Sequence, residues 1–338
     1  MYTFAYPYIL NDTNVRRIIF LIALIISGSV LSGCKSNSQE THEVNTQLII
    51  FHAGSLSVPF KQMKVAFEKE NTNVTILLEA AGSVKCARKI TDLKRDCDIM
   101  VSADYTIIDE MLIPDYASWN IKFASNEMAI VYHKASGYSE EINAQNWHEI
   151  LLHDDVLFGR SDPNSDPCGY RTVLTTQLAE DYYNQPGLTE KVLKKNQEYI
   201  RPKEVDLLAL LESNNIDYIF LYRSVAEQHK LNFVILPDSI NLKDPGLREF
   251  YRKAKVNITG KTPGSIITKT GQPMVYGITI LDNAPNKKLA QKFIDFALSH
   301  NGGIKIMEEN GQPSTIPSYS ETYSAIPEQL KQYAKHIP

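Results

Sequence analysis

Strand-like and helix-like segments alternate along the chain from Leu48 onward, and this alternation restricts the fold more than any other sequence feature. A first apolar run, 48–52, ends at a small-residue turn and is followed by a helical pattern over 58–70. A second run, 74–79, repeats this order, with a helix that reaches residue 94. Strand, loop and helix in this succession are typical of βαβ units with a parallel sheet. We therefore predict an α/β protein.

The alternation continues over most of the remaining chain. Further strands are predicted at 97–102, 128–132, 156–159, 217–222, 233–236 and 275–280, and further helices at 172–183, 188–198, 205–213, 286–299 and 302–310. Residues 238–272 show no clear pattern. The length of 338 residues suits two domains, since domains commonly hold about 100–150 residues. The net charge of −4, without basic clusters, argues against a nucleic-acid partner.

The N-terminal segment has the pattern of an export signal. Arg16 and Arg17 precede the apolar run 18–26, and Leu31-Ser32-Gly33-Cys34 follows. So short a run, between a positive patch and small residues, is typical of a secretory signal rather than a membrane span. Residues 31–34 resemble the bacterial lipobox, whose cysteine is acylated and becomes the mature N-terminus. An uncleaved anchor is the alternative.

From this pattern we expect two consecutive parts before the folded body, with a lipid at the first residue of the second part. Residues 1–33 form a lipoprotein signal peptide, Cys34 carries the lipid, and the polar residues 34–47 form a tether. The protein is then expected on the periplasmic or cell-surface face of a bacterial membrane.

Two Gly-Ser turns are the first candidate ligand site. Gly54-Ser55 and Gly82-Ser83 lie 28 residues apart, each at the end of a predicted strand and the start of a helix. Such turns present backbone amides and a hydroxyl at the positive end of a helix dipole, on the sheet edge where ligands dock. Together they suggest one anion held between two helix starts, although ordinary N-capping is the alternative.

Two carboxylates form a second signal. Asp166 lies in a polar loop after a predicted strand, and Glu204 lies at the start of a predicted helix, eighteen residues before Tyr222. From position alone, both carboxylates could be helix caps and nothing more.

Several sequence blocks resemble the tungstate/molybdate-binding proteins of ABC importers, of the WtpA/ModA-like type first seen in archaea. The blocks are Ala53-Gly54-Ser55-Leu56, Gly82-Ser83, Asp166-Pro167-Cys168-Gly169-Tyr170-Arg171, Arg201 to Leu208, and Val275-Tyr276-Gly277-Ile278-Thr279. The resemblance implies a type II periplasmic-binding-protein fold, in which two α/β lobes joined by two crossover strands hold an anion in the cleft. Lobe I is expected at 46–125 plus 280–325, and lobe II at 126–279.

The same resemblance implies the residues that bind the ligand. The expected hydrogen-bonding residues are Gly54, Ser55, Ser83, Cys168, Gly169 and Tyr222. Asp166 and Glu204 would each give one carboxylate oxygen to the metal centre, making tungstate or molybdate six-coordinate. Asp162 is the alternative to Asp166. The oxyanion is then a ligand, no cofactor is expected, and the partners are an ABC permease and its ATPase, with the binding protein a monomer.

Physical chemistry makes such a site selective. Two carboxylates facing a dianion repel it strongly where the effective dielectric is low, which excludes sulfate and phosphate. Tungsten(VI) and molybdenum(VI) accept further oxygen ligands, whereas the sulfur of sulfate does not. The sequence does not rank tungstate against molybdate.

Other readings remain beside this one. A binding lipoprotein of the same fold for sulfate, phosphate or an organic acid is the nearer rival. A secreted serine hydrolase is remote, because residues 52–57 lack the closing glycine of the GxSxG motif, and we expect no enzyme. In an exported chain, Cys86 and Cys97 could form a disulfide or remain two buried thiols.

Overall fold

The computed structural model describes residues 45–262 and 264–337, whose strands form two larger sheets and two small ones. The expected signal peptide, Cys34 and most of the expected tether lie outside these residues. Within them, no helix combines the length and apolar character needed to cross a membrane. The predicted α/β architecture is confirmed.

The first large sheet has the order β2-β1-β3-β12-β4. Its strands are β1 (Thr46–Ala53), β2 (Val74–Ala81), β3 (Ile99–Ser102), β4 (Ile121–Ser125) and β12 (Val275–Ile280). β1 pairs in parallel with β2 and β3, whereas β12 runs antiparallel to β3 and β4. β1 begins at Thr46, so the last two residues of the expected tether already belong to the sheet.

Helices cover this sheet through apolar side chains at helical spacing. They are α2 (Ser57–Glu70), α3 (Ser83–Thr91), α12 (Lys287–Leu298) and α13 (Gly303–Glu309). In α2, Phe60, Met63 and Phe67 recur every three to four residues and are buried. The Phe67 ring packs edge-on against Phe293 of α12, with centroids 5.2 Å apart. We call this sheet with its helices the first lobe.

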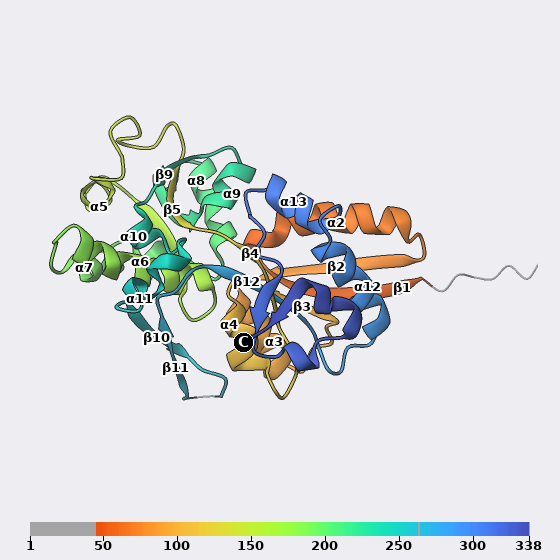
Figure 1. The fold of residues 1–338 in the computed structure, drawn as a ribbon. Helices are drawn as coiled ribbons and strands as arrows, with labels where there is room; N and C mark the ends of the chain where they lie inside the picture. The colour runs from red at the N-terminus through yellow and green to blue at the C-terminus, as the bar shows by residue number, and fades with distance from the viewer. Residues whose placement is uncertain (1–44, 263, 338) are drawn as a thin grey trace, which may run out of the picture. The chain divides into compact units, whose positions relative to one another are not determined.

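The second large sheet has the order β7-β6-β8-β5-β9. Its strands are β5 (Met128–Tyr132), β6 (Phe158–Ser161), β7 (Ile200–Arg201), β8 (Tyr218–Tyr222) and β9 (Asn232–Ile235). The helices around it include α5 (Trp147–Ile150), α6 (Pro167–Tyr182), α7 (Leu188–Lys194), α8 (Leu208–Glu212), α9 (Arg223–Gln228), α10 (Asp238–Asn241) and α11 (Arg248–Tyr251). We call this sheet with its helices the second lobe (Figure 1).

A hairpin occupies part of the stretch in which the sequence showed no pattern. β10 (Lys255–Thr259) pairs antiparallel with β11 (Ile266–Thr270). It reaches toward α3 and α4 (Tyr105–Ile107) of the first lobe (Figure 1), where the Arg88 side chain donates to the carbonyl of Thr259. The chain passes from one large sheet to the other between β4 and β5, and returns between this hairpin and β12.

One expectation needs correction, and one alternative that the sequence left open is decided. The helix predicted from residue 172 begins five residues earlier, at Pro167, because Asp166 caps it and proline suits the first turn. The disulfide considered between Cys86 and Cys97 is not formed, and both are buried free thiols. Their sulfurs contact the carbonyls of His52 and Ile49, which lie three residues apart on β1 and hence roughly 10 Å apart.

Candidate functional site

The two Gly-Ser turns lie side by side at one edge of the first sheet. β1 and β2 pair in parallel with Ala53 opposite Ala81, so Gly54 and Gly82 leave the sheet at the same level. Gly54 opens a 3₁₀ turn (Gly54–Leu56), and Ser83 begins α3. The pairing of neighbouring strands therefore brings the two predicted turns together.

The two carboxylates come from different segments of the second lobe and lie next to each other. Asp166 is the N-cap of α6, and Glu204 opens a 3₁₀ turn (Glu204–Leu207) that leads into α8. The Glu204 backbone amide donates to Asp166 Oδ2 at 2.9 Å. Both side chains are completely buried.

The absence of side chains at Gly54 and Gly82 lets the lobes meet at this point. A Cβ on Gly54 would lie 2.9 Å from Glu204 Oε2, and a Cβ on Gly82 would lie 2.9 Å from the Cβ of Asp166 and closer still to the carbonyl of Ser165. The same Ser165 carbonyl accepts a hydrogen bond from the Lys85 amide at 3.1 Å. Each turn of the first lobe thus faces one of the two carboxylate residues.

The Glu204 carboxyl group is buried with little compensation. Within the described part of the chain, neither of its oxygens makes a hydrogen bond of normal geometry. Burial, followed by the charge of Asp166, raises the pKa of Glu204 well above its usual range, and the nearby Ser55 amide opposes the rise only in part. Burial also raises the pKa of Asp166, although contacts with Glu204 and Ser161 oppose it.

Among the described residues, no Lys, Arg or His side chain forms an ion pair with Asp166 or Glu204, and the nearby Arg171 and Lys203 pair with Asp104 and Asp206 instead. Among residues 45–262 and 264–337, no group of three or more His, Cys, Asp or Glu side chains is placed to hold a metal ion. Ionising both buried carboxyl groups is costly, since a buried charge demands pairing or hydrogen bonds, and the raised pKa values of Glu204 and Asp166 express this cost. The arrangement suits a ligand whose own centre accepts carboxylate oxygens.

The hydroxyl of Ser55 is held as a hydrogen-bond donor. Its Oγ accepts from the phenol of Tyr276 at 3.1 Å. That phenol in turn accepts from the side-chain amides of Asn126, at 2.8 Å, and Gln312, at 3.3 Å. Because Tyr276 accepts twice, its proton is directed to Ser55, and the Ser55 proton stays available to another acceptor.

Ser83 and Tyr222 follow the same principle. Ser83 Oγ accepts from the backbone amide of Ala103 at 2.9 Å. Tyr222 Oη accepts from Arg171 Nη1 at 2.9 Å. Both side chains are fully buried, and neither hydroxyl donates a hydrogen bond to another described residue, so both protons are available to an oxyanion.

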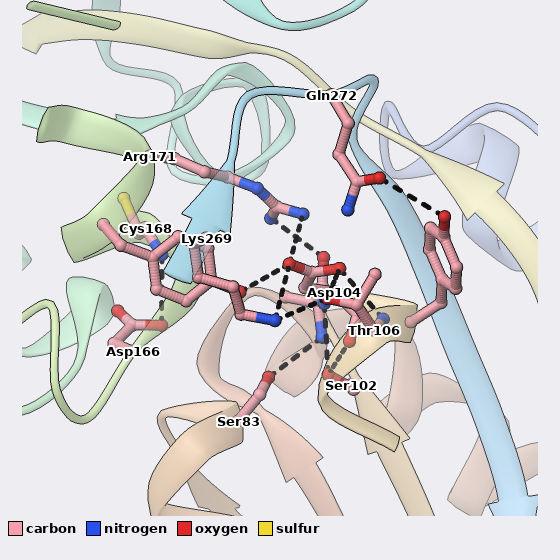
Figure 2. Close-up of polar contacts among 12 residues, drawn as sticks. Ser83, Ser102, Asp104, Thr106, Asp166, Cys168, Arg171, Lys269 and Gln272 are labelled. Carbon is pink, nitrogen blue, oxygen red and sulfur yellow. Dashed lines mark hydrogen bonds and ion pairs between the residues drawn. The ribbon is translucent and has the colours of Figure 1, made fainter. Parts of the chain in front are cut away.

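A buried charged cluster beside these donors was not found from the sequence. Figure 2 shows Asp104 between Arg171 and Lys269, with Asp166 and Cys168 to one side. Asp104 Oδ2 accepts from the phenol of Tyr170 at 2.6 Å and lies 3.9 Å from Arg171 Nη2 and 4.0 Å from Lys269 Nζ. Burial opposes ionisation of Asp104, but the charges of Lys269 and Arg171 outweigh it and lower its pKa.

We call Asp104, Tyr170, Arg171 and Lys269 the Asp104 cluster. Asp104 belongs to the first lobe, and its three partners belong to the second lobe or its hairpin. Asp104 follows a predicted strand, and Arg171 is the last residue of the block 166–171, yet no sequence spacing links the two residues. The cluster joins the two lobes directly next to the candidate anion site.

Some predicted ligand groups already have protein partners. The Cys168 amide donates to Asp166 Oδ1 at 3.4 Å, and the Gly169 amide donates to the Asp166 carbonyl at 3.0 Å. Asp162 accepts from the Asn164 amide and the Ser165 hydroxyl within its own turn. The roles of these groups toward an oxyanion therefore stay predictions.

Comparison with known proteins identifies the relatives of this chain. A family model described as bacterial extracellular solute-binding protein matches residues 48–311. An uncharacterized solute-binding protein of Petrotoga mobilis is 45% identical over 326 residues, which cover 95% of this chain and 98% of the relative. The molybdate/tungstate-binding protein WtpA of Pyrococcus abyssi is 43% identical over 330 residues, covering 89% and 94%. The resemblance inferred from the sequence blocks is confirmed.

Solved structures support the fold. The periplasmic molybdate-binding protein of Azotobacter vinelandii matches with a TM-score of 0.58 at 14% identity, covering 78% of this chain and 98% of that one. The sulfate-binding protein SubI of Mycobacterium tuberculosis matches with a TM-score of 0.57 at 13% identity, covering 80% and 88%. At these identities the likeness concerns the fold alone, and the predicted periplasmic-binding-protein fold is confirmed.

The matched family and these relatives are solute-binding proteins rather than enzymes, as predicted. The chain belongs to the bacterial extracellular solute-binding protein family.

Proposed function

We propose that this protein captures tungstate or molybdate outside the cytoplasm and delivers it to an ABC importer. The observation that carries the proposal is the Glu204 carboxyl group, which is completely buried beside Asp166 and whose oxygens make no hydrogen bond of normal geometry within the described residues. A ligand centre that accepts one oxygen from each carboxylate would remove this cost.

The chemistry of the pair supports this class of ligand over other oxyanions. Both carboxylates would repel sulfate or phosphate, whose central atoms accept no further oxygen ligands. Relatives support the same choice, because the proteins of Pyrococcus abyssi and Thermococcus kodakarensis, 43% and 41% identical, are named molybdate/tungstate-binding proteins.

Capture would proceed by closure of the lobes. Ser55 and Ser83 belong to the first lobe, whereas Asp166, Glu204 and Tyr222 belong to the second. An oxyanion contacts all of them only when the lobes are together, so binding shifts the population toward the closed form. The closed form would then dock on the permease, and the ATPase would drive release.

The delivery role includes an anchor. Cys34 in the lipobox-like sequence 31–34 would carry the lipid, and the protein would work as a monomer at the membrane surface. Mass spectrometry of Cys34-containing peptides from the membrane fraction tests this part, and an unmodified Cys34 would contradict it.

Isothermal titration calorimetry tests the ligand. We expect binding of tungstate and molybdate that millimolar sulfate does not displace. Asp166→Asn and Glu204→Gln should abolish measurable binding, whereas the matched control Asp162→Asn should leave the affinity within about threefold, because Asp162 serves its own turn. Displacement by sulfate, or unchanged tungstate affinity in the first two variants, would contradict the proposal.

A further inference from the structure

A chain of hydrogen bonds links the donor hydroxyls of the two lobes. Arg171 Nη1 donates to Tyr222 Oη and to the carbonyl of Ala103, each at 2.9 Å. The Ala103 amide donates to Ser83 Oγ, also at 2.9 Å. Tyr222 of the second lobe is thereby connected, through one guanidinium and one residue of the first lobe, to Ser83.

The guanidinium is held in a single place by its surroundings. Arg171 is 3% exposed, lies 3.9 Å from Asp104, and sits with its guanidinium carbon 5.7 Å from the Tyr222 ring centroid. Its planar fork offers only donors, at fixed angles. Tyr222 Oη must therefore accept from Arg171, which leaves the phenol proton on the opposite side of the oxygen.

The position of that proton matters because competing acceptors are close. The carboxylates of Asp166 and Glu204 are near enough for their charges to raise the pKa of Tyr222, although burial is the largest cause and Arg171 opposes the rise. A phenol free to rotate could donate to one of these carboxylates instead of to a bound oxyanion.

We propose that Arg171 is a positioning residue, which orients the Tyr222 hydroxyl so that it donates to the oxyanion. Because the same Arg171 nitrogen also binds the Ala103 carbonyl of the first lobe, this orientation belongs to the closed arrangement of the lobes. This inference rests on the proposed function. Arg171 itself does not contact the ligand; it acts through Tyr222.

A double-mutant cycle measured by calorimetry with tungstate tests the inference. Tyr222→Phe should weaken binding by roughly 10- to 150-fold, the effect of losing one hydrogen bond to a charged group. Arg171→Lys keeps the positive charge but loses the planar fork, and should cost a similar factor. In the Tyr222→Phe background, the cost of Arg171→Lys should be at least about threefold smaller, since the bond to Tyr222 is already gone and only the losses at the Ala103 carbonyl and Asp104 remain.

Tyr170→Phe is the matched control. It removes a buried hydrogen bond between the lobes, from Tyr170 to Asp104, without removing either Arg171 bond. The factor by which Tyr170→Phe weakens tungstate binding should be the same in the parent and in Tyr222→Phe, as expected for independent contributions to closure. Circular dichroism verifies that each variant is folded. If Arg171→Lys is unfolded, Arg171→Gln replaces it in the cycle. The effect of the lost charge on tungstate affinity is then the same in the parent and in Tyr222→Phe, and it cancels when the two are compared.

The outcomes separate the two proposals. If the unmodified protein binds neither tungstate nor molybdate, the proposed function and this inference both fail. If it binds and the costs at Arg171 and Tyr222 multiply fully, the positioning role is overturned while the function stands.

Discussion

A methyl group at position 82 should keep the lobes from closing. Gly82 has φ −58° and ψ 142°, a conformation that alanine adopts freely, so Gly82→Ala does not strain its own lobe. The added Cβ would instead lie 2.9 Å from the Asp166 Cβ and overlap the Ser165 carbonyl of the second lobe. The substitution therefore acts on closure rather than on folding.

Two contributions set how much binding free energy Gly82→Ala should cost. Overpacking of a tight contact costs about 1–3 kcal/mol. Displacing the Ser165 carbonyl also loses its hydrogen bond from Lys85, which adds about 0.5–1.5 kcal/mol. Together these predict a binding free energy weaker by roughly 1.5–4.5 kcal/mol, or about 13- to 2,000-fold in Kd.

Calorimetry with tungstate measures the affinity, and urea unfolding of the ligand-free protein measures stability. Gly137→Ala is the matched control, because its Cβ would meet only Asp217 Oδ1, at an ordinary 3.5 Å, far from the turns. A Gly82→Ala protein that binds tungstate within threefold of the parent would refute the closed arrangement described above.

Three further predictions concern the surroundings of the site. Tyr276→Phe removes the donor to Ser55 and should weaken tungstate binding roughly 2- to 13-fold by calorimetry; no change would exclude this orienting role. Lys269→Met leaves Asp104 with less positive charge, and urea unfolding should show a loss of about 1–3 kcal/mol, whereas equal stability would contradict that role. Burial and Asp166 raise the pKa of Glu204, so its contribution to the stability of the ligand-free protein should be largest at acidic pH and fall as pH rises through the raised pKa, whereas buried His52, whose pKa burial lowers to about 4, contributes in the opposite direction. Between pH 5 and pH 8, thermal melting should therefore show the Tm of the parent protein falling relative to that of Glu204→Gln; a difference in Tm that stays constant over this range would contradict the prediction.

Local patterns predicted the elements on which the candidate site is built. The runs that became β1 and β2 end in Gly-Ser turns, and parallel pairing suffices to place those turns together. The predicted start of α6 was wrong because it followed the helical spacing of apolar side chains, which begins after the first turn of the helix. The Asp166 cap and Pro167 mark the true start.

The contacts between the lobes could not be predicted in the same way. Asp104 meets Lys269 although 165 positions separate them, and nothing local to either residue indicates the pairing. The β10–β11 hairpin was missed although β10 alternates polar and apolar residues, because in β11 the apolar Ile266 is 67% exposed while the charged Lys269 is buried, so the apolar positions do not mark the buried face. Such pairings depend on how two separately folded sheets approach each other.

The register of β1 and β2 has a consequence for the order of events in capture. Since Ala53 and Ala81 are paired within one sheet, Ser55 and Ser83 keep their separation whether the second lobe is near or far. An arriving anion can therefore make its first contacts on a ready-made half of the site. The rate of association should depend on these two serines, and the lifetime of the complex on Asp166, Glu204 and the residues that hold the lobes together.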